Sequence, residues 1–456
     1  MTILSGRAPG DFTRPYKLPY QLGVYLAVNA VRDLYAVIDG PDCLFRKAEW
    51  VHGKHDLMSS LLDVLGRHRI VSSLVNAEAV VKDRGERLAA RLRQVDAIPG
   101  AKAALVCAMP HVMIIGTQYD RILRGLESEL SIKMMEVPSL SLQGDWVDGY
   151  VESLAALARG IPLEATTPDP RVVAIVGYLH DRNEADCTAN VEELRRLFGA
   201  VGLEVSSVWL SGKGTADLAK VAEAGTIVAF PLGKKAAHIL GERTGARVIE
   251  VDTPFGPTRT RRMLRKVGEA TGFLDEVEPF FEQELRAWVP RFEWIVPQLF
   301  FGKRMAFGGA PDLMGGMFQI ATELGMEVSW MAASTARTDW ADPLPQEFAD
   351  LPPLMFAPSE RKLYEMSHDP RAPLDLLVGD SVFGDLTSDD SRHVSLGFPS
   401  HHSHAIFDRP HLGIRGWACL IDRMAAALGR TEREALRGAA PIVVGAARAG
   451  ADERDD

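Results

Sequence analysis

The sequence is poor in cysteine and has no long apolar run. Four cysteines among 456 residues exclude a disulfide framework, and no stretch approaches the ~20 apolar residues that span a bilayer. The N-terminal segment MTILSGRAPGDFTRP lacks the apolar core of a signal peptide. The net charge of −10 excludes a general nucleic-acid binder, because phosphate contacts need clustered cations. We therefore expect a cytoplasmic protein that binds neither nucleic acid nor membrane.

What is present is the composition of a folded protein with several cores. The chain is about three times as long as a typical domain of ~150 residues, and 46% of its residues are hydrophobic and 25% charged. From residue 171 onward, short β-branched runs alternate with segments of helical period. Such alternation predicts βαβ units and parallel sheets. Expected strands lie at 34–40, 68–74, 103–109, 171–178, 203–210, 226–230, 246–253, 303–309, 327–335, 374–380 and 393–399.

Two segments divide the chain into three predicted domains. Residues 166–170 form a polar, proline-rich linker, and residues 274–300 read as a helical connector broken near Pro290 and Pro297. We therefore expect an N-terminal domain at 1–167, a central domain at 168–292 and a C-terminal domain at 293–456 that ends in a polar tail. The predicted fold class is α/β, with three doubly wound, mostly parallel-sheet (Rossmann-like) domains.

Loops that follow strands are the candidate binding segments, because open parallel sheets bind ligands beyond the carboxyl ends of their strands. No segment carries GxGxxG or GxxxxGK[ST], so we expect this chain to bind no nucleotide. The candidate loops are 39–43, 107–111, 178–186, 211–215, 230–234, 308–312 and 400–411.

An ordered set of motifs resembles the component 1 subunits of nitrogenase. IDGPDC (38–43) resembles a His-Gly-Pro-x-Gly-Cys segment, and ALVCAMPHVMIIG (104–116) resembles Thr-Cys-Met-Pro-Glu-x-Ile-Gly. HRIVSSLVNAEAVV, GKRMAFGGAPDLMGGMFQIATELGMEV, DLLVGDSVFG and GFPSHHSHAIFDRPHLGIRGW follow the same order along nearly the whole chain. The family includes nitrogenase, its cofactor-assembly scaffold, the dark-operative protochlorophyllide and chlorophyllide reductases, and methylthio-alkane reductase.

The resemblance implies a subunit of a nitrogenase-like two-component reductase. Three α/β domains would surround a metallocluster or substrate pocket, and the chain would pair with a homologous or identical subunit as a dimer or heterotetramer. A separate ATP-dependent iron–sulfur protein would deliver low-potential electrons to reduce a small-molecule or tetrapyrrole-like substrate. The alternatives are a scaffold for cluster assembly, a cluster-free docking subunit, and an unrelated multi-domain α/β transferase.

The chain departs from the family pattern at its cysteines. Cys43 lies one residue closer to its Gly-Pro than the family's first cluster cysteine does, and Cys107 precedes the place of the third. His68 and Arg69 stand where the second is expected. The central cysteine that holds the nitrogenase cofactor aligns near residues 231–232, and the cofactor histidine aligns close to Ser403.

Cys43 and Cys107 are the candidate cluster ligands. A [4Fe–4S]-type cluster needs about four ligands, mostly thiolates, so two cysteines imply a cluster shared with a partner subunit. Asp42 is a candidate oxygen ligand beside them. The alternative is that both cysteines are small buried side chains at strand ends.

Histidines concentrate in the loop that follows residues 397–399. His401, His402 and His404 are the candidate catalytic residues, and His411 follows them. Imidazole titrates near neutral pH, so it suits proton transfer or metal binding in a pocket. The alternative is a solvated loop.

A basic segment stands out in this acidic chain. PTRTRRMLRK (257–266) carries five basic residues. A solvated helix face is the default interpretation of such a segment, and the alternatives are binding of an acidic substrate tail or pairing with acidic groups of a neighbouring subunit. The turn 211–215 is glycine-rich and precedes a helix, so it is either an anion site or a plain connection.

Overall fold

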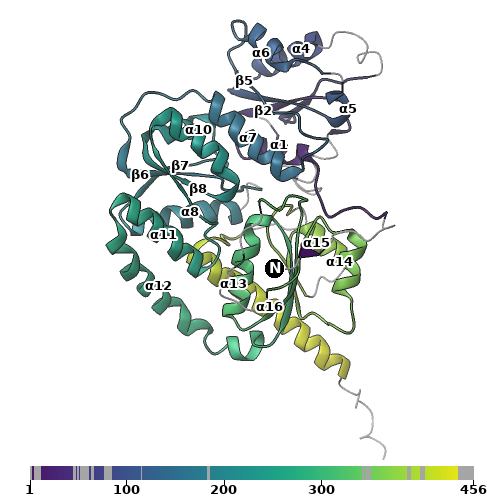
Figure 1. Ribbon diagram of the computed structural model, residues 1–456, viewed down its shortest axis with the longest axis vertical. Coiled ribbons are helices and arrows are strands. Elements are labelled where there is room, and N and C mark those ends of the chain that lie inside the picture. Colours follow the sequence, from purple (N-terminus) through teal and green to yellow (C-terminus); the bar gives the residue numbers. More distant parts are fainter. Residues whose placement is uncertain are drawn as a thin grey trace, which may run out of the picture.

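Three parallel sheets build the molecule, each wrapped by helices (Figure 1). The computed structural model describes residues 3–4, 12–44, 48, 51, 61–62, 66–76, 85–114, 116–181, 185–340, 344, 351–387, 392–400 and 406–439. Every strand pair within the three sheets is parallel. Parallel strands are covered on both faces, which explains the nearly unbroken apolar runs in the sequence.

The first sheet has the strand order β3-β2-β4-β5. Alternate residues of β2 and β4 face opposite helix layers, so Ile38 and Cys107 lie in one core and Val37 and Val106 in another. The elements of this unit are α1 (Tyr20–Asn29), β2 (Leu34–Asp39), β3 (Ile70–Ser72), α4 (Gly85–Asp96), β4 (Ala103–Ala108), α5 (Pro110–Met113), α6 (Tyr119–Leu126), β5 (Lys133–Glu136) and α7 (Trp146–Gly160).

The central sheet has the order β7-β6-β8-β9. Its longest strand, β6, pairs with both β7 and β8. The elements are β6 (Asp169–Val176), α8 (Ala185–Ala200), β7 (Glu204–Val208), α9 (Thr215–Ala219), η1 (Lys220–Glu223), β8 (Ala224–Ala229), η2 (Pro231–Gly233), α10 (Lys234–Thr244), β9 (Arg247–Glu250) and α11 (Pro257–Thr271).

The third sheet has the order β1-β12-β11-β10-β13-β14, so the first strand of the chain forms its edge. Its elements are β1 (Ile3–Leu4), β10 (Arg304–Gly309), η5 (Pro311–Leu313), α13 (Met314–Glu323), β11 (Glu327–Ala333), β12 (Leu354–Phe356), α14 (Glu360–Ser367), β13 (Leu376–Gly379), α15 (Ser381–Thr387), β14 (His393–Ser395) and α16 (Gly413–Ala439).

The predicted connector between the second and third sheets is helical. It consists of η3 (Leu274–Glu276), α12 (Val277–Phe292) and a π-helix, η4 (Val296–Phe300). Pro290 lies inside the last turn of α12, and Pro297 opens the π-helix. Both prolines therefore stand where regular α-helix gives way, because proline has no N–H to donate.

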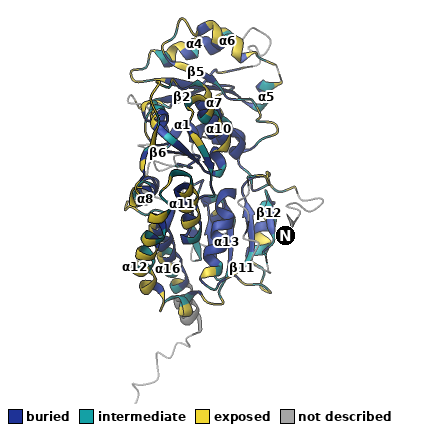
Figure 2. Cartoon of the chain, turned by 60° about the vertical axis from the view of Figure 1, so that its left-hand side comes forward, coloured by how far each residue is buried: buried dark blue, intermediate teal, exposed yellow. Residues whose placement is uncertain are grey.

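Helix α1 is buried on all sides, unlike the half-exposed helices at the surface (Figure 2). It crosses α7 with backbone against backbone. A Cβ on Gly23 would lie 1.9 Å from the Trp146 carbonyl oxygen, and one on Gly149 would lie 2.0 Å from the Tyr20 carbonyl oxygen. Only glycine permits this approach at both positions.

The α/β fold class and the parallel sheets are confirmed, and the expected strands lie within two residues of the observed ones, except that β9 and β14 end three and four residues earlier than expected. The domain limits at 167/168 and 292/293 stay a prediction. Strands β1, β5 and β12 and helices α5, α6, α7, α14 and α15 were not predicted from the sequence. Among the residues that the structure describes, no helix combines the length and apolar composition that crossing a bilayer requires.

Candidate functional site

A small cavity lies between the central and third sheets, at the carboxyl ends of their strands. Four predicted loops reach it, through Tyr178, Phe230, Asp312 and His411. The cavity volume is ≈ 30 Å³, enough for one or two water molecules. We call it the intersheet cavity. Its wall includes Asp181, Asp312 and His411, and the last two are the buried groups that give it the means to hold or move a proton.

Asn190 of α8 fixes the position and the tautomer of His411. Its Oδ1 accepts hydrogen bonds from the backbone N–H groups of His411 at 2.8 Å and Leu412 at 2.9 Å. The remaining amide group is therefore an NH₂, and it lies 3.0 Å from Nδ1 and 3.5 Å from Nε2 of His411. Because an amide NH₂ can only donate, the shorter contact favours Nδ1 as the acceptor, with the proton of the neutral ring on Nε2.

The pKa of His411 is lowered to about 4, chiefly because burial disfavours the imidazolium. Asp181 opposes this shift and Arg423 adds to it. His411 is therefore neutral near pH 7, with an N–H group that can donate.

Glu193, one helical turn after Asn190, holds the segment that carries His411. Its Oε1 accepts from the backbone N–H groups of Ile414 and Arg415, both at 3.2 Å, in the first turn of α16. Arg196 in turn bonds both carboxylate oxygens of Glu193 and both of Glu284 on α12. Helix α8 of the central unit thus caps the N-terminus of α16 in the third unit. This contact holds in place the segment of the cavity wall that carries His411.

Asp312 is a buried carboxyl group in η5, directly after β10. Thr253 donates to its Oδ2 at 3.3 Å, while Oδ1 is buried without a hydrogen-bond partner among the described residues. Burial raises the pKa of Asp312 to about 6. Environments that push two titratable groups in opposite directions are typical of acid–base sites, although structural networks also produce them.

The candidate ligand Cys43 lies on an exposed loop beyond β2, and Asp42 beside it is also exposed. Two serines of the next strand anchor this loop: Ser72 donates to the Gly40 carbonyl at 2.7 Å, and the Gly40 N–H donates to Ser73 at 3.0 Å. Cys43 is thus presented at the surface, where a second subunit can reach it.

Cys107 occupies a different setting, inside β4 and beneath α1. It is fully buried, and burial raises the pKa of its thiol to about 12. The hydroxyl group of Tyr25 is buried nearby with no hydrogen-bond partner in the described part of the chain. Burial raises the pKa of Tyr25, and the charges of Cys107 and Cys43 raise it further.

The described residues do not complete an iron–sulfur site. No group of three or more His, Cys, Asp or Glu side chains among them is arranged to hold a metal ion. A cluster needs deprotonated ligands, and the raised pKa of Cys107 disfavours its thiolate. The geometry of Cys107 agrees better with the alternative of a small buried side chain.

Arg69 stands where the family's second cysteine is expected, and it has a structural role. Its side chain is buried, and Nη1 donates to the carbonyl oxygens of Val28, Val31 and Leu34 at 2.6, 2.7 and 2.6 Å. These carbonyls lie at and beyond the end of α1, where the helix leaves acceptors unpaired. The Arg69 guanidinium therefore supplies the hydrogen-bond donors that these carbonyl groups at the end of α1 lack within the helix.

Several predicted site residues lie outside the described part of the chain. These are His401, His402 and His404, so their catalytic role stays a prediction. Of the histidine-rich loop, His411 is described, and it reaches the intersheet cavity.

The glycine-rich turn 211–215 is occupied by a group of this chain. Asp33 accepts hydrogen bonds from both the backbone N–H and the hydroxyl of Thr215, each at 2.8 Å. The turn therefore connects the first and central units through a carboxylate.

Sequence reasoning named the loop that contains Asp312 but missed Asn190 and Glu193. Both are polar positions on the buried face of α8, between Val191, Leu194 and Leu197. The signal available in the sequence was a pair of polar residues, three positions apart, on an otherwise apolar face of this helix.

Comparison with known proteins gives consistent matches. Residues 21–429 match the family described as Nitrogenase component 1 type Oxidoreductase. One of the subunits of the light-independent protochlorophyllide reductase of Heliobacterium modesticaldum is 22% identical over 428 residues, covering 88% of this chain and 76% of that protein. The nitrogenase molybdenum-iron protein beta chain of Acidithiobacillus ferridurans is 24% identical over 327 residues, covering 64% and 61%.

Among solved structures, nitrogenase Cp1 at pH 6.5 superposes with a TM-score of 0.78 at 14% identity, covering 97% of this chain and 98% of that one. At this identity the likeness establishes the fold.

We predict that Arg69→Met lowers the free energy of unfolding by about 3–5 kcal/mol, because it leaves buried carbonyl groups without their charged donor. Chemical denaturation measures the change. Arg67→Met, at an exposed neighbouring position, should alter stability by less than about 0.5 kcal/mol. Equal effects of the two substitutions would contradict the structural role of Arg69.

We predict that His411 makes the protein less stable in acid. Its pKa is about 4 in the folded chain against an ordinary 6.5, so the unfolded chain binds more protons between these pH values. The contribution of His411 to the free energy of unfolding is fully present above pH 6.5, and it falls by about 3 kcal/mol as the pH drops to 4. Denaturation of wild type and His411→Gln across this range should show that loss in wild type alone. Parallel profiles would refute it.

Proposed function

Because the chain belongs to the nitrogenase component 1 type oxidoreductase family, we propose that it is one subunit of a two-component reductase. A homologous or identical subunit pairs with it, and an ATP-dependent iron–sulfur protein supplies low-potential electrons. The match over residues 21–429, together with the three-sheet fold, carries this proposal. The names of the relatives favour an unsaturated small molecule or a tetrapyrrole-like compound as substrate. None of the four cysteines forms a disulfide, which supports the proposal of a reducing, cytoplasmic setting.

The intersheet cavity is the proposed source of protons. Reduction of an unsaturated bond consumes a proton with each electron, so the site needs a group that releases protons near neutral pH. Asp312 has its pKa raised to about 6 by burial, which places it close to that range. The Nε2–H of His411 adds a donor in the same wall. His401, His402 and His404 remain the proposed catalytic groups of the adjoining loop.

An iron–sulfur cluster, if this complex holds one here, would be shared between subunits. Exposed Cys43, with Asp42 next to it, is the ligand that this chain would offer. Cys107 is the second proposed ligand, although its burial raises the pKa of the thiol and so disfavours the thiolate that a cluster needs. The alternative is a cluster-free docking subunit, and it is supported by the structural role of buried Arg69, which the resemblance sets at the family's second cysteine.

The cluster proposal predicts where iron is found. The chain purified anaerobically alone should contain no stoichiometric iron, and its complex with a homologous partner should contain about four iron atoms per site. Cys43→Ser should lower the iron content of the complex and its visible absorbance, and Cys107→Ala tests the second ligand in the same way. Cys419→Ser, in α16, is the matched control and should keep full iron.

Iron content that is unchanged by Cys43→Ser, in a complex that does hold iron, would remove this chain from the ligand set. Iron absent from every complex would favour the docking subunit.

The proton-source proposal predicts opposite effects on stability and activity. Asp312→Asn should raise the free energy of unfolding at pH 8 by about 1–3 kcal/mol, because the carboxyl is ionised there against its environment. The same substitution should lower ATP-dependent reduction of acetylene, or of the physiological substrate, at least about tenfold. Glu323→Gln, which changes a carboxyl group whose pKa is also raised by desolvation but which does not line the intersheet cavity, is the control for turnover. Wild-type rates in Asp312→Asn would exclude Asp312 as a proton source.

A further inference from the structure

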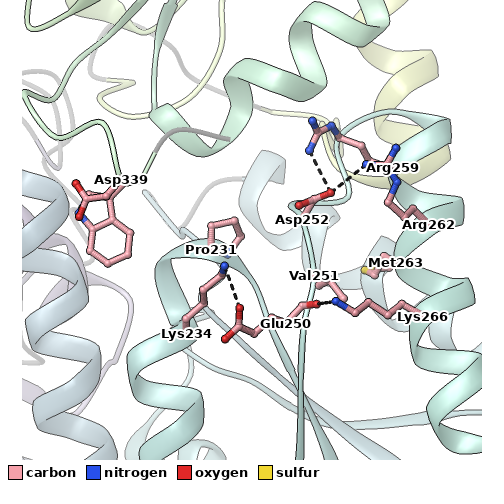
Figure 3. Close-up of a pocket in the computed structure, with 11 residues that line it drawn as sticks. Pro231, Lys234, Glu250, Val251, Asp252, Arg259, Arg262, Met263, Lys266 and Asp339 are labelled. Carbon is pink, nitrogen blue, oxygen red and sulfur yellow. Dashed lines mark hydrogen bonds and ion pairs between the residues drawn. The ribbon is translucent and has the colours of Figure 1, made fainter. Parts of the chain in front are cut away.

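A second and larger cavity opens beside β9, away from the acid–base groups. Its volume is ≈ 260 Å³, and Figure 3 shows basic side chains of α11 converging on it from one side. Residues 231 and 250–252 form its floor, at the carboxyl ends of β8 and β9. This is the edge at which parallel sheets bind ligands. The intersheet cavity uses the neighbouring residues of the same loops, Phe230 and Thr253.

Four cations line this cavity: Lys234 from α10 and Arg259, Arg262 and Lys266 from α11. Three carboxylates also line it, and one of them, Asp339, pairs at 2.6 and 2.9 Å with Arg337, which also pairs with Asp148. The cavity wall therefore carries an excess of positive charge in a chain whose net charge is −10.

The two remaining carboxylates are each shared between two basic side chains. Asp252 lies 3.5 Å from Arg259 and 3.3 Å from Arg262, and both distances are longer than a strong charged hydrogen bond. Glu250 contacts Lys234 at 3.0 Å and is also shared with His238. Arg262 keeps donor groups that an incoming anion can use, since a guanidinium has five N–H donors.

One more donor points to a ligand. Trp340 lines the cavity, and its indole Nε1 is buried with no hydrogen-bond acceptor in the part of the chain that the structure describes. A buried N–H without an acceptor is unfavourable, and a ligand oxygen would satisfy it.

We propose that this basic cavity binds the carboxylate or phosphate group of a small anionic molecule. Arg262 supplies guanidinium donors at the cavity, and Lys266 adds a charge there although its Nζ also donates to the Glu250 carbonyl oxygen at 2.6 Å. Buried Arg259 adds a third positive charge to the wall, and the Trp340 N–H adds a neutral donor. This inference does not depend on the proposed reduction, because it concerns binding by the chain itself.

Calorimetric titration of the full chain with inorganic phosphate and, separately, with succinate tests the proposal and distinguishes the two anion types. The titrations use a low-salt buffer without other polyvalent anions, since ion pairing weakens with ionic strength. We expect saturable binding of at least one anion. Arg262→Gln and Lys266→Gln should each weaken it about tenfold or more, and Trp340→Phe should weaken it severalfold by removing only the N–H.

Arg265→Gln is the matched control. Arg265 lies on the same helix with similar exposure, but it pairs with Glu278 of α12 and does not line the cavity. It should leave the affinity within twofold of wild type, and all variants should keep wild-type melting temperatures. No saturable binding of either anion, or equal weakening by Arg262→Gln and Arg265→Gln, would overturn the proposal.

Discussion

The first turn of α16 governs the arrangement of the candidate site, because its N–H groups have no partners within the helix. Asn190 and Glu193 of α8 accept four of the backbone N–H groups between residues 411 and 415. One helix of the central unit therefore completes the start of a helix in the third. Through this contact His411 is fixed in one tautomer, and the intersheet cavity acquires its wall. Arg196 and Glu284 extend the same network to α12.

Much of the fold was predictable because parallel strands buried on both faces have an unmistakable pattern. RVVAIV and TIVAF are continuous apolar runs, and both are central strands. Strands β1 and β12 contain two and three residues and lie at or near a sheet edge, so they leave no period to detect. The loops of the site followed from the position of strand ends. Asn190 and Glu193 did not, since their partners are more than 200 residues away.

The N-terminal unit depends on a buried cation. The guanidinium of Arg69, which the sequence resemblance sets at the family's second cysteine, donates to the carbonyl oxygens of Val28, Val31 and Leu34. A buried cation with such partners stabilises the end of α1, which itself packs backbone to backbone on α7. Helix α7 then reaches the third unit through the Trp146 indole N–H, which donates to Ser334 at 3.0 Å. The contact of α1 with α7, and that of α7 with Ser334, therefore link the first unit to the third.

The opposite pKa shifts of Asp312 and His411 have an electrical consequence. Between about pH 4 and pH 6 both groups are neutral, and above this range the pair carries a single negative charge. Negative charge that enters a buried region raises the pKa of a carboxyl group within it. An electron delivered near this cavity would therefore draw a proton onto Asp312, so that charge is compensated where it accumulates. Reduction and protonation at such a position are thermodynamically linked, and each makes the other more favourable.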